Sequence, residues 1–216
     1  GLLLRHGVQF HWRNAGYRDF QDFLETLERD KRKKIRQERR RVEEAGIRFR
    51  HQLGSEISDA DRDFFYRCYA RTYRQHRSTP YLSPEFFVRI GATLAENLLL
   101  VIAERDGRPI AAAFNVFDAA SLYGRYWGAL EYVPALHFEA CYYQAIEFCI
   151  ARGIQTFEGG AQGEHKLARG LLPVCTASAH WLRDARFTSA VADYLARERG
   201  GVEQYVDELN ERSPFK

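Results

Sequence analysis

The sequence predicts an α+β protein, a mixed fold whose mainly antiparallel central sheet is flanked by helices. Three apolar runs between residues 98 and 129 are separated by short polar turns, the first of which is Asp106-Gly107. Asp-Gly between apolar runs is typical of a β-hairpin, so the three runs predict an antiparallel meander. Residues 47–53 alternate in polarity, which predicts a further strand with one buried face. Residues 59–77 and 138–152 instead repeat apolar side chains at helical spacing.

The first 46 residues predict a strand followed by a long helical segment. Residues 8–12 are apolar and aromatic, and residues 17–45 have a helical pattern with an apolar stripe from Phe20 to Leu27. Gly46 predicts the end of this helix.

Residues 29–41 form a strongly basic part of that segment, with nine basic residues against Asp30 and Glu38. Ile35 and Val42 give it one thin apolar edge. Two interpretations remain open: a solvated helix held by charge pairs, or a helix that faces the phosphate of a ligand, RNA or lipid head groups. The absence of interleaved aromatic residues disfavours single-stranded nucleic acid.

Capping residues define the helices that follow. Ser58 or Asp59 predicts one N-cap, Ser83-Pro84 starts the next helix to about Glu96, and Gly153 ends a third. The remaining strands and helices are expected at residues 98–104, 109–117, 121–129, 154–157, 164–169, 175–182 and 187–209. In the helix 138–152, Glu139, Tyr143 and Glu147 share a separate stripe that is either solvated or functional.

The stretch from Thr156 to Gly170 concentrates more titratable and flexible residues than any other segment. A short strand gives way to a glycine cluster, where backbone can approach a ligand without a Cβ in the way. A polar helix follows, with His165 and Arg169 on one face. The alternative is an ordinary turn followed by a solvated helix. Side chains and glycines with a candidate role are Glu158, Gly160, Gln162, Gly163, Glu164, His165, Lys166 and Arg169.

Composition limits the classes of function. With 216 residues and 45% hydrophobic content the chain can bury a substantial core, and a net charge of +3 is too small to imply a nucleic-acid partner by itself. No apolar run is long enough to span a membrane, and the first residues lack the features of a signal peptide. We expect a piece of a longer protein whose N-terminal partner domain precedes it.

The four cysteines form no metal-binding or redox motif. They lack the CxxC spacing, and none of the histidines has zincin spacing, so no metal site is expected. We expect reduced, buried thiols in a cytoplasmic protein. The sequence also contains no G-x-S-x-G motif, which disfavours a serine hydrolase.

From residue 47, the predicted order is strand, helix, helix, three-strand meander, helix, strand, helix, strand. This order resembles the Gcn5-related N-acetyltransferase (GNAT) fold. The chain also resembles a bacterial family of that superfamily named for peptidoglycan biosynthesis or recognition, which is similar to FemAB-type aminoacyltransferases. The segments that carry this likeness are residues 30–41, 122–128, 136–143, 157–166 and 179–181.

The resemblance implies a division of the chain and a reaction. Residues 1–46 would be the end of a preceding domain plus the basic helix, residues 47–185 a GNAT-like acyltransferase domain, and residues 186–216 an extra helix packed on it. The implied reaction is N-acyl or aminoacyl transfer from acyl-CoA or aminoacyl-tRNA to a small-molecule or peptide amine, with tRNA as a partner. The usual pyrophosphate loop is replaced by residues 131–137. The alternative is therefore a non-catalytic ligand-binding domain that retains the fold.

Acyl transfer requires a base, donors for the oxyanion and a cradle for the acyl donor. His137, Glu139 and His165 are the candidate bases, since an imidazole titrates near neutrality whereas a carboxylate must be desolvated. Backbone N–H groups of the glycine cluster, with Gln162 and Lys166, are candidates for the oxyanion or phosphate. The further candidates for substrate or donor binding are Arg125, Trp127, Tyr143, Glu158, Glu164, Arg169 and His180.

Overall fold

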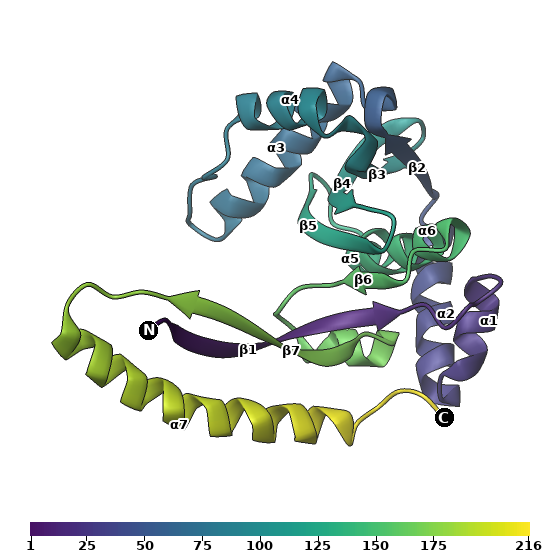
Figure 1. Cartoon of the computed structure of the whole chain (residues 1–216). Coiled ribbons are helices and arrows are strands. Elements are labelled where there is room, and N and C mark those ends of the chain that lie inside the picture. Colours follow the sequence, from purple (N-terminus) through teal and green to yellow (C-terminus); the bar gives the residue numbers. More distant parts are fainter. The chain divides into compact units, whose positions relative to one another are not determined.

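The computed structural model describes all 216 residues (Figure 1). The chain forms two compact units, one of Gly1–Trp12 with Glu158–Lys216 and the other of Arg13–Phe157. The division of the chain expected from the sequence, at residues 46/47 and 185/186, stays a prediction.

The larger unit contains an antiparallel meander, as the sequence predicts. Neighbouring strands pair antiparallel from the first to the fourth. They are β2 (Ile47–Leu53), β3 (Leu98–Arg105), β4 (Arg108–Phe117) and β5 (Ser121–Ala129), and β6 (Thr156–Glu158) follows β5 in the sheet order. Asp106 and Gly107 both have positive φ, 51° and 72°, as a tight hairpin turn requires. Together with the flanking helices this confirms the mixed α+β class and the GNAT-like order of elements.

Serine caps start two helices of this unit. The hydroxyl of Ser58 accepts from the N–H of Asp61, and that of Ser83 accepts from the N–H of Phe86. The helices of the unit are α1 (Phe20–Thr26), α2 (Arg29–Glu44), α3 (Asp59–Gln75), α4 (Pro84–Thr93), α5 (Leu136–Phe138) and α6 (Gln144–Arg152), with single 3₁₀ turns at Gly54–Glu56 and Ala95–Asn97.

The expected single helix over residues 17–45 is wrong, because the chain breaks between α1 and α2. Leu27 is extended, with ψ 159°, and its side chain is fully buried. The break directs the side chain of Leu27 into the core. In a continuous helix, the helical repeat would set a different direction for this side chain. Ile35 and Val42 of α2 are buried as predicted.

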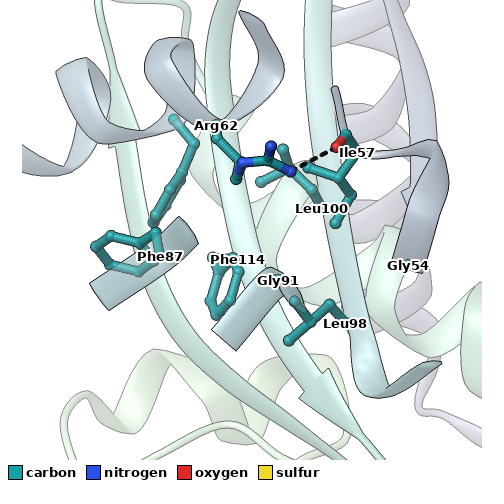
Figure 2. A pocket seen from close by; sticks show the side chains of 9 residues that line it. Gly54, Ile57, Arg62, Phe87, Gly91, Leu98, Leu100 and Phe114 are labelled. Atoms are coloured by element: carbon teal, nitrogen blue, oxygen red, sulfur yellow. Dashed lines mark hydrogen bonds between the residues drawn. The ribbon is translucent and has the colours of Figure 1, made fainter. Parts of the chain in front are cut away.

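Helices α3 and α4 cover one face of the meander (Figure 1). Phe65, Phe87 and Phe114 pack together there, with Phe65 and Phe114 stacked at 5.1 Å between ring centroids. Figure 2 shows an apolar crevice between Phe87, Phe114, Leu98 and Leu100. It has room for about one water molecule, so it is a packing gap of the core and not a ligand site.

The opposite face of the meander carries α2, α5 and α6. Val42 of α2 and Leu136 of α5 join Ile47 and Ala103 in a second core cluster. Between α5 and α6, residues Glu139–Tyr143 are π-helical, and the N–H of Gln144 donates to the carbonyl of Glu139, five residues earlier. The α-helix predicted over 138–152 therefore contains one wide turn, a feature that is frequent at functional sites.

The smaller unit pairs β1 (Leu3–Arg13) with β7 (Leu172–His180), antiparallel from Leu3↔His180 to His11↔Leu172. The 3₁₀ helix Glu164–Arg169 precedes β7, and α7 (Ala185–Asn210) follows it. Arg5 of β1 donates to both carboxylate oxygens of Glu198 of α7, at 3.0 and 2.8 Å. The strand expected at residues 175–182 thus begins three residues earlier.

The cysteines are all free thiols. Cys68 and Cys149 are buried, and burial raises the pKa of each to about 12. Cys175 is exposed, which corrects the expectation that every thiol is buried. No helix has the length and apolar character to cross a lipid bilayer.

Candidate functional site

The larger unit places its candidate site at the carboxyl end of β5 and the helix that follows. Strand β5 is joined to the start of β6, because the carbonyl of Ala120 accepts from the N–H groups of Gln155 and Thr156, both at 3.0 Å. In open α/β sheets, ligands bind in the crevice beyond the carboxyl ends of neighbouring strands.

Strand β5 contains a β-bulge beside this end. Asn115 of β4 pairs with Gly124, but Phe114 pairs with Tyr126, so Arg125 has no counterpart on β4. A bulged residue is left out of the ladder, and bulges next to active sites re-aim neighbouring side chains. The guanidinium of Arg125 lies 5.1 Å from the ring centroid of Tyr123 and the side chain is exposed.

His137 lies in an aromatic cluster at the end of β5. Its ring centroid is 5.6 Å from that of Trp127 and 5.5 Å from that of Tyr142. The preceding Ala135 has φ 66°, a left-handed conformation that is costly for a residue with a Cβ. Such strain occurs where the surrounding structure fixes a functional segment, and here it sets the start of the helical turn that carries His137.

Glu139 is bound by an arginine from α2. The guanidinium of Arg39 donates to Glu139 through Nε at 3.2 Å and to both oxygens of Glu147 at 2.8 and 3.1 Å. The side chain of Glu139 is only 4% exposed. One arginine therefore pairs with two carboxylates of the helix that follows His137.

A second layer of hydrogen bonds surrounds this cluster. The side-chain amide of Gln144 donates to Glu139 at 2.8 Å, and its oxygen lies 2.8 Å from Nε2 of His51. The hydroxyl of Tyr143, which is fully buried, donates to Glu38 of α2. The stripe formed by Glu139, Tyr143 and Glu147 is thus not a solvated face but the surface against which α2 packs.

Burial raises the pKa of Glu139 above its usual value of 4.5, against the opposing effects of Arg39 and Gln144. The folded state therefore holds the proton on Glu139 more tightly than the unfolded chain does. Its contribution to the free energy of unfolding is present in full below the unfolded pKa and is lost as the pH rises through the folded pKa.

We expect Glu139→Gln to remove this component, so that the free energy of unfolding of the variant falls less than that of the wild type as the pH rises from about 4 to 7. Urea titrations at several pH values measure it. Glu44→Gln, an exposed change at the end of α2, serves as the matched control and should follow the wild-type curve. Parallel curves for Glu139→Gln and wild type would contradict the assignment.

The smaller unit holds the glycine-rich loop. The N–H of Gly159 donates to the carbonyl of Phe10 at 2.8 Å, and the N–H of Phe10 donates to the carbonyl of Gly160 at 3.0 Å. The ammonium of Lys166, a buried side chain, donates to the carbonyls of Gly160 and Gln162. Lys166 therefore closes the loop from inside. Backbone N–H groups of residues 160–163 have no protein acceptor.

All but one of the remaining candidates of this unit lie in or beside the same loop, and the exception is His180 at the far end of β7. Gly163 has φ 95°, and a Cβ there would lie 2.3 Å from the imidazole of His165. Glu164 accepts from Tyr205 and Arg212, at 3.1 and 2.8 Å, and these bonds lower its pKa. Arg169 is 1% exposed and donates to the carbonyl of His165 at 2.7 Å. Glu158 ends β6, and His180 ends β7 beside the hydroxyl of Ser178 at 2.8 Å.

The structure brings the candidates together in two groups, one in each unit. The first group is Arg125, Trp127, His137, Glu139 and Tyr143, and the second is Glu158, Gly160, Gln162, Gly163, Glu164, His165, Lys166 and Arg169. His180 lies apart from the second group, because it pairs with Leu3 whereas the loop is bonded to Phe10. Their assignment to one site stays a prediction. Sequence analysis missed Arg39, Gln144 and His51, and only the stripe of polar residues on the helix 138–152 signalled that this surface has a partner.

One family covers the whole chain. The FemAB_like family, described as peptidoglycan biosynthesis/recognition, matches residues 1–216. The chain belongs to the FemAB_like family. The resemblance inferred from the sequence motifs is thereby confirmed, and the sequence has no match among curated proteins.

Solved structures share the fold of this FemAB_like chain at low identity. The C-terminal DUF2156 domain of an Agrobacterium fabrum protein described as a lysylphosphatidylglycerol synthetase aligns with a TM-score of 0.53 and 12% identity, over 78% of this chain and 52% of that one. L-PGS from Bacillus licheniformis gives 0.50 and 11%, over 72% and 46%. A Bacteroides thetaiotaomicron protein of unknown function gives 0.52 and 12%, over 83% and 62%. The chain spans less than two thirds of each. These likenesses show a shared fold.

Proposed function

We propose that the chain transfers an acyl or aminoacyl group to an amine acceptor at the carboxyl end of β5, with His137 as the base. The observation that carries this proposal is the bulge at Arg125 together with the position of His137 against Trp127, two residues further along the same strand. The bulge interrupts the ladder, so backbone polar groups of β5 become available to the oxygen of a reacting carbonyl.

The chemistry removes two protons from the acceptor nitrogen and exchanges one bond for another. His137 removes a proton from the acceptor ammonium, and the free amine nitrogen attacks the carbonyl carbon of the donor. A C–N bond forms, and the C–O bond of an ester donor or the C–S bond of a thioester donor breaks. A second proton leaves the nitrogen as the amide forms and goes to the departing oxygen or sulfur, and the first is released from the imidazole to solvent, so His137 is neutral again at the end of the cycle.

Glu139 is better placed to position the helix than to act as a base. Its carboxylate is held by Arg39 and Gln144 at hydrogen-bonding distance, and it is almost fully buried. A base must contact the acceptor, whereas this carboxylate contacts two protein side chains. We assign Glu139 to orienting the segment that carries His137.

Among the two donor classes, aminoacyl-tRNA fits the chain better than acyl-CoA. A pyrophosphate needs free N–H groups at the start of the helix after β5. Here Pro134 lacks an N–H group, the N–H of Leu136 donates to the carbonyl of Val133 at 3.2 Å, and Glu131 adds a negative charge. Glu131 is itself paired with Arg105 at 2.8 Å. This segment does not offer a pyrophosphate cradle.

The decisive experiment is a transfer assay with purified protein, a mixture of aminoacylated tRNAs or acyl-CoAs as donor, and peptide or small-molecule amines as acceptors. We expect His137→Gln to lower kcat by about 100-fold or more, as loss of a general base does. The loss should be smaller at high pH, where the acceptor amine loses its proton unaided. His76→Gln, an exposed histidine at the end of α3, is the matched control and should retain full activity.

Full activity of His137→Gln would overturn its assignment as base. Binding of a donor without transfer to any amine, in the wild type, would instead support the alternative of a ligand-binding domain that retains the fold without catalysis. The unusual segment that replaces the pyrophosphate loop is the observation that favours this alternative.

A further inference from the structure

We infer that the exposed basic face of α2 binds the phosphate backbone of double-helical RNA. The inference rests on the proposed function, in which the donor is an aminoacyl-tRNA, and it identifies where the RNA part of that donor docks. The basic face consists of Arg29, Arg32, Lys33, Arg36 and Arg40, which together with Gln37 line an open hollow.

The charge of this face is not compensated within the protein. Arginines elsewhere in the same unit are paired with carboxylates, such as Arg50 with Asp61 at 2.9 Å and Arg105 with Glu131 at 2.8 Å. The four most exposed cations of the basic face form no ion pair; they are Arg29, Lys33, Arg36 and Arg40. The only side-chain partner of Arg36 is the neutral amide oxygen of Gln21, at 3.1 Å. Mutual repulsion of these cations is relieved by an external polyanion.

The spacing of the cations suits a row of phosphates. Arg29, Lys33, Arg36 and Arg40 recur at intervals of three or four residues, so they share one side of α2 over about 16 Å of helix axis. Arginine predominates, and its planar guanidinium binds phosphate oxygens with two parallel hydrogen bonds. A single small anion would occupy only part of this row.

The orientation of the basic face is fixed by the opposite side of α2. Ile35 and Val42 are buried, at 1% and 2% exposure, and Arg39 is tied to Glu139 and Glu147. Helix α2 therefore cannot rotate about its axis to change which residues face the solvent. Because Glu139 lies two residues after His137, α2 is also fastened directly to the segment that carries the proposed base.

The same burial favours RNA over a membrane. An interfacial helix inserts an apolar face into the lipid, but the apolar edge of α2 is consumed by the core, and no large apolar side chain of α2 is exposed. The exposed face also lacks aromatic residues on which unpaired bases could stack. Proteins recognise the stem of an RNA helix mostly by its shape, through contacts with phosphates and 2′-hydroxyl groups and without stacking on bases.

Fluorescence anisotropy with labelled, unacylated tRNA tests the inference without requiring any chemistry. The variant Lys33→Gln/Arg36→Gln/Arg40→Gln should bind tRNA at least about tenfold more weakly than the wild type. The slope of log K against log salt concentration should also be smaller in magnitude by about two to three. The matched control removes three exposed cations elsewhere, Arg89→Gln/Arg108→Gln/Arg197→Gln, and should lose less than about threefold.

Equal losses in the two triple variants would overturn the inference, as would tRNA-independent binding of the basic face to vesicles that contain phosphatidylglycerol. The result separates from that of the transfer assay. Tight tRNA binding that depends on α2, without any transfer, would contradict only the proposed reaction. Transfer from an acyl-CoA without tRNA binding would contradict only the inferred role of α2 in binding RNA.

Discussion

Replacing Gly128 with alanine is expected to destabilise the larger unit by about 3 kcal/mol or more, because overpacking that moves backbone exceeds the usual cost of an added methyl group. A Cβ at this position would lie 2.2 Å from the carbonyl oxygen and 2.9 Å from the Cβ of Cys68 on α3. Both atoms belong to a buried helix, so no flexible side chain can move aside. Urea unfolding followed by tryptophan fluorescence measures the loss.

Gly200→Ala is the matched control for this change. A Cβ at Gly200 meets no atom within 4 Å, and the residue lies inside α7. The control should gain up to about 1 kcal/mol from the higher helix propensity of alanine. If the free energy of unfolding of Gly128→Ala lies within about 0.5 kcal/mol of that of the wild type, helix α3 does not lie as close to β5 as the structure places it.

Removal of the Arg39 side chain is expected to cost about 3 kcal/mol, since breaking a buried pair leaves an uncompensated charge. Arg39→Ala leaves Glu139, which is 4% exposed, beside Glu147 with no cation between them. The free energy of unfolding at neutral pH measures the effect. Because Glu139 then favours its protonated form, the deficit should shrink as the pH is lowered.

Two further variants test the cause. Arg41→Ala removes an exposed cation from the same helix and should change stability by less than about 0.5 kcal/mol. Combining Arg39→Ala with Glu139→Gln should recover part of the loss, because the buried charge is gone. Additive losses in the double variant would show that Arg39 acts through its guanidinium, which lies over the ring of Phe20 at 4.5 Å from the centroid, and not through Glu139.

Much of the fold follows from short-range signals in the sequence. Asp106-Gly107 specifies a hairpin turn, Ser58 and Ser83 specify helix starts, and Gly153 adopts the left-handed conformation that ends α6. Each of these residues acts on neighbours within a few positions, so its effect is visible locally. The break at Leu27 was not predictable, because its cause is burial against residues distant in the sequence.

The candidate site was predicted less completely for the same reason. The stripe of Glu139 and Glu147 is visible from helical spacing, but its partner Arg39 lies 100 and 108 residues away. Arg39 is one of nine basic residues in its segment, and spacing alone does not single it out. The contacts of Lys166 with two carbonyls of its own loop were likewise not visible from spacing, and its role toward a ligand stays a prediction.

The extra residue in β5 affects how this sequence can diverge. Because Arg125 is skipped by the ladder, Tyr123 and Tyr126 both pair with residues whose side chains face α3 and α4, Val116 and Phe114. Deleting Arg125 would remove only the bulge, because Tyr123 and Gly124 on one side and Tyr126 and Trp127 on the other would keep their partners on β4. Descendants of this chain can therefore lose the codon of Arg125 without reversing the faces of β5, whereas the loss of one codon within β3, which has no extra residue, would turn one end of that strand inside out.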